Sequence, residues 1–425
     1  MASLTNKSYR VAFILITSLF FLWGFAHNLD PVLIPHLKRS FTLTTTQATL
    51  VDSAVFIAYF LMALPAGAII KKFGYKIGII TGLLLFAIGS FLFIPAANTQ
   101  LYDFFLLALF IIACGLTILE TAANPFSSAL GDPETATLRL NFSQSFNGLA
   151  AAMAPWIGGK IILVKGASDE DLKKMTEAVR KVTLASEASS VKLPYFILGC
   201  VLIVIAIVFA FTKIPKIETE TGQVASKNIF HAFKHKNLTW GVIAQFFYVG
   251  AQVCVISLFI LYAPKAAGIT KIQATGYAFF CGLAFLIGRG VGTALMSKIK
   301  AQKLLALYAA INVLLCIVAI TAHGMITVYT VIGICFFMSI MFPTIFSLGI
   351  QGLGGDTEFG SSLIIMSIVG GAILPRVFGY IADTTGNIQL GYIVPLVCFA
   401  VVMLFGLSGY KATAKEVQNA PNEIL

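Results

Sequence analysis

Charged residues are scarce in this chain. Asp, Glu, Lys and Arg together make up 11% of its 425 residues, whereas a soluble globular domain carries about 25%. Hydrophobic residues reach 58%, and the mean hydropathy is +0.90. Because no polar stretch is long enough for a sizeable soluble domain, the composition indicates an integral membrane protein.

The sequence also lacks the motifs of enzyme chemistry. It has no GxSxG, no phosphate-binding loop and no pairing of cysteine with histidine. The seven cysteines lie inside apolar runs without metal-ligand spacing, so we interpret them as packing residues. The net charge of +11 is spread over short loops without a basic aromatic face, which argues against a nucleic-acid partner. We therefore expect no enzyme activity, no cofactor and no structural metal.

Long apolar runs dominate what is present. A membrane-spanning helix needs about 20 mainly apolar residues, and these runs show no alternation of the kind that a transmembrane barrel requires. The sequence therefore predicts an all-α membrane protein with twelve transmembrane helices. The runs span residues 10–35, 47–70, 77–97, 102–127, 139–164, 193–212, 238–263, 274–297, 303–322, 325–350, 360–382 and 389–408.

The two halves of the chain echo one another. Three short patterns recur at nearly one spacing, which indicates two six-helix repeats. The paired patterns begin at Gly67 and Gly292, at Gly131 and Gly355, and at Pro155 and Pro375. We accordingly expect an N-terminal bundle over 1–212, a cytoplasmic linker over 213–237, a C-terminal bundle over 238–410 and a cytoplasmic tail over 411–425.

Lysines in the loops predict the orientation. The loops after the second, sixth and eighth runs are rich in lysine, and such loops stay in the cytoplasm. The segment 165–192 would be an exception on the outer side, but acids balance its lysines. We expect a multi-pass protein of the plasma membrane, the inner membrane in a bacterium, with both termini in the cytoplasm.

Acidic residues inside the runs are the first candidates for function. Only Asp30, Asp52 and Glu120 lie within an apolar run and away from its last residues. A central acid costs roughly 2.5–3.5 kcal/mol on insertion scales, so an acid at such a position is commonly part of an ion or proton path. We favour ion or proton coupling at Glu120 and Asp30, with Asp52 evenly balanced and sodium possible at Asp30 and Asp52. The alternative is a structural acid paired with an arginine.

Amides form the second group of candidates. Carboxylates and amides beside aromatic rings suit a sugar, because they exchange hydrogen bonds with hydroxyl groups while a ring packs on the apolar sugar face. The alternative is that the amides join helices to one another. The candidate substrate-binding residues are Asn28, Glu120, Asn124, Gln144, Asn147, Gln245, Tyr248 and Gln252.

Basic residues inside the runs form the third group of candidates. We expect Arg139 to form an ion pair with neighbouring acids at the inner face, and Arg289 to belong to a structural charge network near an inner gate. Arg376 fits either a ligand contact or a partner of an acid. His27 fits either a proton relay or a packing role.

Several motifs resemble the fucose permease branch of the major facilitator superfamily. They are FFLWGFAHNL, YKIGIITGL, LETAANPF, RLNFSQSFN, AQFFYVGAQ and MFPTIFSLGI. GAIIKKFGYK is similar to the superfamily's G-x-x-x-D-R-x-G-R-K loop, with Lys71 at the aspartate position. The resemblance implies the major facilitator fold and sugar–cation symport.

The resemblance also implies roles for particular residues. The family's fourth-helix acid matches Glu120, and its fifth-helix amides match Gln144 and Asn147. The family's first-helix acid falls on Pro31, whereas this chain has its acid one residue earlier, at Asp30. One residue turns a helical side chain by about 100°, so the two acids would not point the same way on a regular helix.

Together these features predict a secondary active transporter. It would import a hexose-type sugar with H+ or Na+ by alternating access, acting as a monomer in the lipid bilayer. The alternatives are a sugar uniporter or exporter, or a membrane receptor that binds a ligand without moving it.

Overall fold

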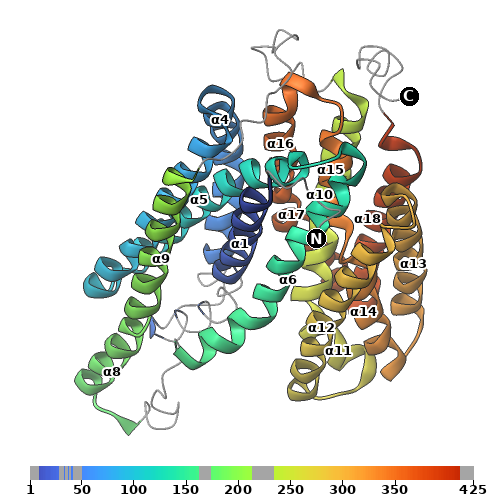
Figure 1. Ribbon diagram of the computed structural model, residues 1–425. Coiled ribbons are helices and arrows are strands. Elements are labelled where there is room, and N and C mark those ends of the chain that lie inside the picture. The colour runs from blue at the N-terminus through green and yellow to red at the C-terminus, as the bar shows by residue number, and fades with distance from the viewer. Residues whose placement is uncertain are drawn as a thin grey trace.

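The computed structural model describes residues 9–27, 33, 37, 40–41, 50–161, 174–212 and 234–411 (Figure 1). Over these residues the chain is helical, with no strand. In the first part of the chain the helices are α1 (Arg10–His27), α4 (Leu50–Thr99), α5 (Tyr102–Ala129), η2 (Pro133–Thr135), α6 (Ala136–Ile161), α8 (Glu177–Ser189) and α9 (Lys192–Phe211).

The second part of the chain is built in the same way. Its helices are α10 (Lys236–Ser257), α11 (Phe259–Ala267), α12 (Lys271–Leu295), α13 (Ala301–Thr321), α14 (Met325–Met338), α15 (Met341–Ile350), η4 (Gly354–Asp356), α16 (Thr357–Met366), η5 (Ser367–Val369), α17 (Gly370–Thr385), η6 (Ile388–Tyr392), α18 (Ile393–Leu404) and the π-helical η7 (Phe405–Gly409).

The predicted apolar runs correspond to these helices. Ten helical stretches of the described chain are long and apolar enough to cross a membrane. One of them, within α4, contains both the second and the third run, because the chain reverses at Gly74 with a positive φ of 83°. A Cβ placed on Gly78 would lie 2.7 Å from Cγ1 of Ile70, a contact that only a reversal brings about. The fifth run is α6, which has too many polar residues to be included among the ten.

Helices pack mainly with neighbours from their own part of the chain. The helices α1 to α9 form one half, in which α4 packs on α5 and α9, and α1 packs on α6. The helices α10 to η7 form the other half, in which α13 packs on α18 and α12 on α14. Figure 1 shows the blue-to-green half beside the yellow-to-red half, with α6 between them. The repeated G-D-x-E patterns occupy matching places, at η2 before α6 and at η4 before α16.

Apolar side chains cover the outside of the molecule. The helix α9 is an example, because large apolar residues are exposed along its whole length. In water such exposure would cost about 25 cal/mol per Å² of apolar surface, so this surface suits hydrocarbon rather than water. The exposed residues of α9 are Leu193, Phe196, Ile197, Val201, Val204, Ile207, Val208 and Phe211.

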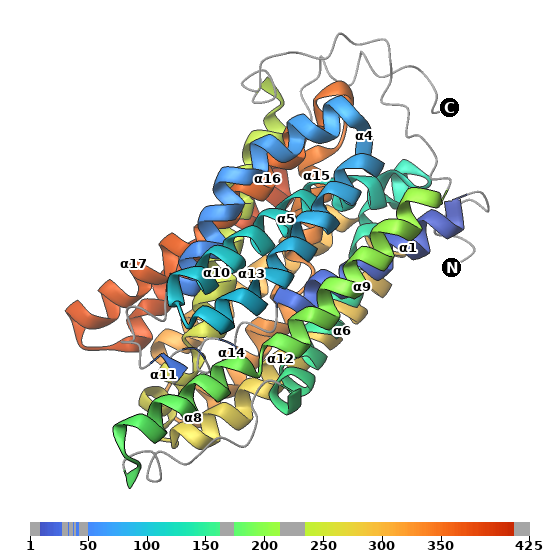
Figure 2. The same ribbon diagram turned by 90° about the vertical axis from the view of Figure 1, so that its left-hand side faces the viewer.

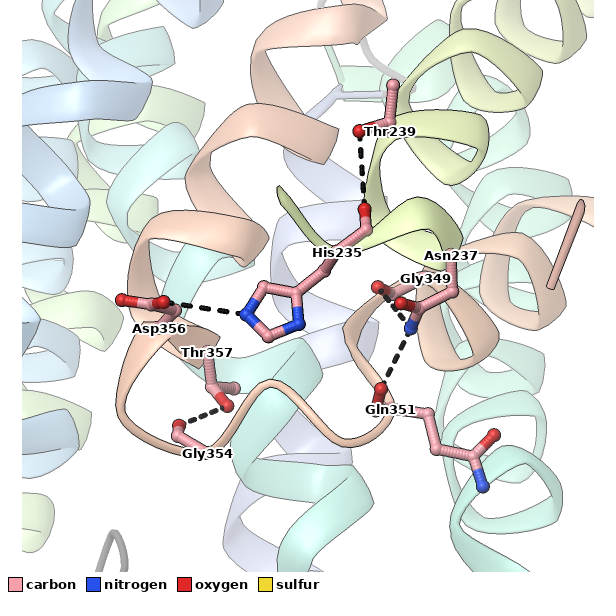
Figure 3. Close-up of polar contacts among 8 residues, drawn as sticks. All are labelled: His235, Asn237, Thr239, Gly349, Gln351, Gly354, Asp356 and Thr357. Atoms are coloured by element: carbon pink, nitrogen blue, oxygen red, sulfur yellow. Dashed lines mark hydrogen bonds and ion pairs between the residues drawn. The ribbon is translucent and has the colours of Figure 1, made fainter. Parts of the chain in front are cut away.

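We call the end of the molecule where α9 ends and α10 begins the linker side. Polar contacts hold the second half together there (Figure 3). The amide of Asn237 donates to the carbonyl oxygens of Gly349, at 3.3 Å, and Gln351, at 2.8 Å, which satisfies the free end of α15. Nε2 of His235 lies 3.5 Å from Oδ2 of Asp356.

The two halves touch each other closely on the linker side, where α4 and α16 lie side by side (Figure 2). Gly67 lets them approach, since a Cβ there would lie 2.1 Å from Oγ of Ser362. The hydroxyl of Ser361 donates to the carbonyl oxygen of Thr121 across the same boundary, at 2.8 Å. The sequence pattern predicts neither contact, because both depend on how the two halves pack against each other.

Candidate functional site

A cavity of about 300 Å³ lies between the two halves. Its volume is at the lower end of the range for small-molecule pockets. The first half contributes most of the polar groups, and the second half contributes a mainly apolar wall with one arginine. The lining residues are Trp23, His27, Val55, Phe56, Tyr59, Glu120, Gln144 and Asn147 from the first half, and Val249, Gln252, Val253, Ile256, Ser257, Arg289, Phe342 and Ile368 from the second.

Glu120 is the acid of this cavity. It lies on α5 among residues that are otherwise buried, and its own side chain is half-buried at the cavity wall. The hydroxyl of Tyr59, on α4, donates to Oε1 of Glu120 at 2.9 Å. A bond to an ionised group is worth about 1.5–3 kcal/mol, so Tyr59 holds this carboxylate in one orientation. Among the described residues no hydrogen bond to the other carboxylate oxygen is seen, so that oxygen is available to a ligand or a proton.

Two amides of α6 share the wall with Glu120. Gln144 and Asn147 are three residues apart, which places both on one face of the helix. Nε2 of Gln144 donates to Oδ1 of Asn124 at 3.2 Å, and Asn124 itself is fully buried. Asn124 therefore stands behind Gln144 and orients it, and it does not line the cavity.

The first helix packs tightly against these amides. A Cβ placed on Gly24 would lie 2.8 Å from Cγ of Asn147 and 2.9 Å from its Cα. Real Cβ atoms essentially never approach so closely, so the absence of a side chain at Gly24 is what lets α1 and α6 meet here. Trp23, next to it, lies on the cavity wall and packs on Phe20 with ring centroids 4.2 Å apart.

Of the three predicted substrate residues on α10, the structure places one on the cavity wall and two away from it. Gln252 lines the cavity. Gln245 and Tyr248 are fully buried and lie on the linker side of the residues of α10 that reach the cavity. Spacings of three and four residues put all three on one face of α10, but Gln245 and Tyr248 lie at a depth where α10 packs on helices of its own half.

The three arginines have different surroundings. Arg289 lines the cavity, whereas the sequence led us to expect it in a structural network near an inner gate. Arg139 is fully buried, and its guanidinium donates to the hydroxyl of Thr135 at 2.6 Å and to the carbonyl oxygen of Ser128. Arg376 is exposed on α17 and does not belong to the cavity wall.

Some candidate residues lie outside the part of the chain that the structure describes. These are Asn28 and Asp30, and also the side chain of Asp52, whose backbone lies in α4. His27, the last described residue of α1, reaches the cavity wall. The roles expected for Asn28, Asp30 and Asp52 stay predictions.

Sequence reasoning missed Tyr59 and Trp23. A tyrosine or tryptophan in an apolar run costs little in hydrocarbon, so neither stood out as the acids and amides did. The one available signal was that aromatic rings accompany amides in sugar sites, and that signal does not say which ring faces the cavity.

Known proteins resemble this chain over most of its length. The family model of the Major Facilitator Superfamily matches residues 11–351. The L-fucose-proton symporter of Escherichia coli (strain K12) is 41% identical over 408 residues, which cover 94% of this chain and 93% of the relative. The glucose/galactose transporter of Brucella abortus biovar 1 (strain 9-941) is 40% identical over 411 residues, which cover 96% of each chain.

Solved structures agree with these relatives. A crystal structure described as a Major Facilitator Superfamily transporter in the outward conformation is 41% identical, with a TM-score of 0.88. The match covers 94% of this chain and 99% of that one. A XylE double mutant, at 13% identity and a TM-score of 0.69, shares the fold alone.

Proposed function

This chain belongs to the Major Facilitator Superfamily, and on that premise we propose that it is a secondary active transporter that imports a hexose-type sugar together with protons. One observation supports this most directly: a cavity between the two halves carries an acid, three amides and aromatic rings. Binding sites at the junction of two repeats are typical of such transporters, because rocking of the halves exposes the site to each side in turn.

The cavity wall suits a sugar. Gln144 and Asn147 offer both donors and acceptors, and Gln252 offers the same from the opposite half. Trp23 presents a ring on which an apolar sugar face packs. The names of the relatives include L-fucose, glucose and galactose, so the substrate class we propose is a six-carbon sugar.

Glu120 is the group that we propose takes up the proton. Its carboxylate faces the cavity and accepts a hydrogen bond from Tyr59, so it meets water or sugar when the cavity is open. Asp30 is proposed as a second acid on the ion path, with a lesser part for Asp52. Relatives named for proton symport favour H+ over Na+.

The contacts between the halves support an outward-facing state. The hydrogen bond from Ser361 to Thr121 and the close approach of Gly67 and Ser362 both lie on the linker side, and they support a path to the cavity that is closed from that side. We propose that the lysine-rich loops and both termini lie in the cytoplasm, which makes this an outward-facing state in the plasma membrane. Because one chain supplies both halves of the cavity, we propose that it acts as a monomer.

Counterflow in proteoliposomes tests the proposal. Vesicles loaded with unlabelled D-galactose, L-fucose or D-glucose are diluted into the labelled sugar, and transient accumulation of label is expected for at least one of them. Uptake is then driven by a pH gradient or a sodium gradient applied separately, and the pH gradient is expected to drive it. Binding without counterflow would identify a receptor instead, and uptake indifferent to both gradients would identify a uniporter.

A further inference from the structure

Polar contacts between the halves follow one face of α6. At its linker-side end, Oγ1 of Thr137 and Oγ of Ser347 lie 2.8 Å apart. One turn further along, Nδ2 of Asn141 donates to Oγ1 of Thr344 at 3.2 Å. Both contacts join α6 of the first half to α15 of the second, and both are between uncharged groups.

A third contact continues the same line to the edge of the cavity. Nη1 of Arg289, on α12, donates to the carbonyl oxygen of Gln144 at 2.7 Å. Spacings of four and then three residues from Thr137 place Gln144 on the same face of α6 as the first two contacts. We call the three contacts together the α6 seam.

Arg289 is held firmly on its own side of the seam. Its Nε donates to the carbonyl oxygen of Ser339 at 2.9 Å, where α14 ends and a carbonyl is free of helix bonding. Its guanidinium lies over the ring of Phe285, 4.7 Å from the centroid. Only 4% of the residue is exposed, so its position is determined by packing on α12 and α14.

The guanidinium also belongs to the cavity. It is the one charged side chain that the described part of the second half contributes to the cavity wall, on which Glu120 lies in the first half. A guanidinium has five N–H donors, and its two bonds to carbonyl oxygens use two of them. The remaining donors can bind sugar hydroxyls in the cavity, so a bound sugar and the Gln144 carbonyl share one cation.

We propose that Arg289 is the positioning residue that couples sugar in the cavity to the α6 seam, holding the Gln144 carbonyl in the sugar-free state and releasing it when sugar hydroxyls bind the guanidinium. This rests on the proposed function as a sugar transporter. Arg289 makes the charge-assisted contact of the seam, which is stronger than a contact between neutral groups. Its release leaves the two neutral contacts as the remaining bonds of the seam.

A buried residue on the linker side reports opening of the seam. Ser362 is completely buried, with 0% of its surface accessible, and it faces Gly67 across the boundary between the halves. Ser362→Cys in a Cys200→Ser background is treated with a small maleimide, because the other native cysteines are buried. The labelling rate of the purified sugar-free protein then measures how often the linker side opens.

Arg289→Met removes the charge and keeps much of the side-chain volume. A lost bond to a charged group should raise the population of the open form, and hence the labelling rate, by about tenfold or more. Arg289→Lys keeps the charge without the two directed bonds and should give an intermediate rate. In the chain with native Arg289, D-galactose or L-fucose should raise the labelling rate, whereas neither should raise it further in Arg289→Met.

A second variant, made at Gly148 on α6 of the first half, displaces the guanidinium of Arg289. A Cβ on Gly148 would lie 3.6 Å from Nη1 of Arg289, an ordinary contact, so Gly148→Ala is the matched control with unchanged labelling. Gly148→Leu occupies the space of the guanidinium and should increase labelling as Arg289→Met does. This variant decides the matter if Arg289→Met fails to fold.

The outcomes separate the two proposals. Unchanged labelling in both Arg289→Met and Gly148→Leu would overturn the role of Arg289, as would a weaker sugar affinity without any change in labelling, which would make it a plain sugar contact. A chain that shows no counterflow with any of the three sugars would overturn the proposed function, whatever the labelling of the variants.

Discussion

Asn124→Ala tests whether a residue behind the cavity sets the affinity for sugar. Oδ1 of Asn124 accepts from Nε2 of Gln144 at 3.2 Å, and Asn124 is fully buried. A neutral hydrogen bond contributes about 0.5–1.5 kcal/mol, and this one is at the long end of the usual distances. Since the bond orients an amide that we propose binds sugar, its loss should raise the sugar Kd roughly fivefold.

The same change should affect stability little. Nδ2 of Asn124 is buried without a hydrogen-bond partner among the described residues, and leaving such a group unpaired costs about 1–3 kcal/mol. Its removal offsets part of the cavity that alanine leaves, so we expect Tm to fall by only a few degrees. We therefore expect the substitution to change the free energy of sugar binding more than the free energy of unfolding.

Equilibrium binding of D-galactose and L-fucose to purified protein, together with a thermal melt, measures both quantities. Ser128→Ala is the matched control, because Ser128 lies one turn further along α5, donates to the backbone carbonyl of Asn124 at 3.1 Å and does not line the cavity. Its sugar Kd should stay unchanged. An unaltered Kd in Asn124→Ala would refute the positioning role, and a loss of a hundredfold or more would mean that Asn124 contacts the sugar directly.

Three further predictions concern the acid and the crossing of α1 with α6. Glu120→Gln should abolish accumulation driven by a pH gradient while counterflow persists, and accumulation at the normal level would remove Glu120 from proton coupling. Tyr59→Phe deletes the donor to Glu120, 2.9 Å away, so the initial rate of proton-driven uptake should drop about tenfold at unchanged expression; a normal rate would show that the bond has no part in transport. Gly24→Ala should destabilise the protein by about 1–3 kcal/mol and weaken sugar binding, because its Cβ would meet Asn147 at 2.8 Å. Gly276→Ala, with no atom within 4 Å of its Cβ, is the control in the same melt, and equal melts would contradict the packing argument.

Local chemistry explains how much of the site the sequence could predict. Glu120, Gln144 and Asn147 stood out because polar groups are expensive in hydrocarbon, and all three lie on the cavity wall. Tyr59 did not stand out, because its ring is at home in an apolar helix. Its role depends on α4 and α5 packing so that its hydroxyl reaches a carboxylate 61 positions away.

Gln245 and Arg289 show the limit of reasoning from helical faces. The spacing of Gln245 and Gln252 correctly puts them on related faces of α10, but depth along the helix decides which one reaches the cavity. For Arg289 the sequence predicts a place in a structural charge network. Only the crossing of α12 with α6 brings it to the Gln144 carbonyl.

The sequence by itself determined the membrane class, the apolar runs and the polar residues that needed an explanation. Those properties depend on run length and on transfer of single side chains from water to hydrocarbon, which are local quantities. Tertiary structure alone decided which side of each helix meets the cavity, that Asn124 supports Gln144 from behind, and that Arg289 crosses between the halves. Those contacts join residues that are far apart in the chain, and their geometry arises from the packing of whole helices.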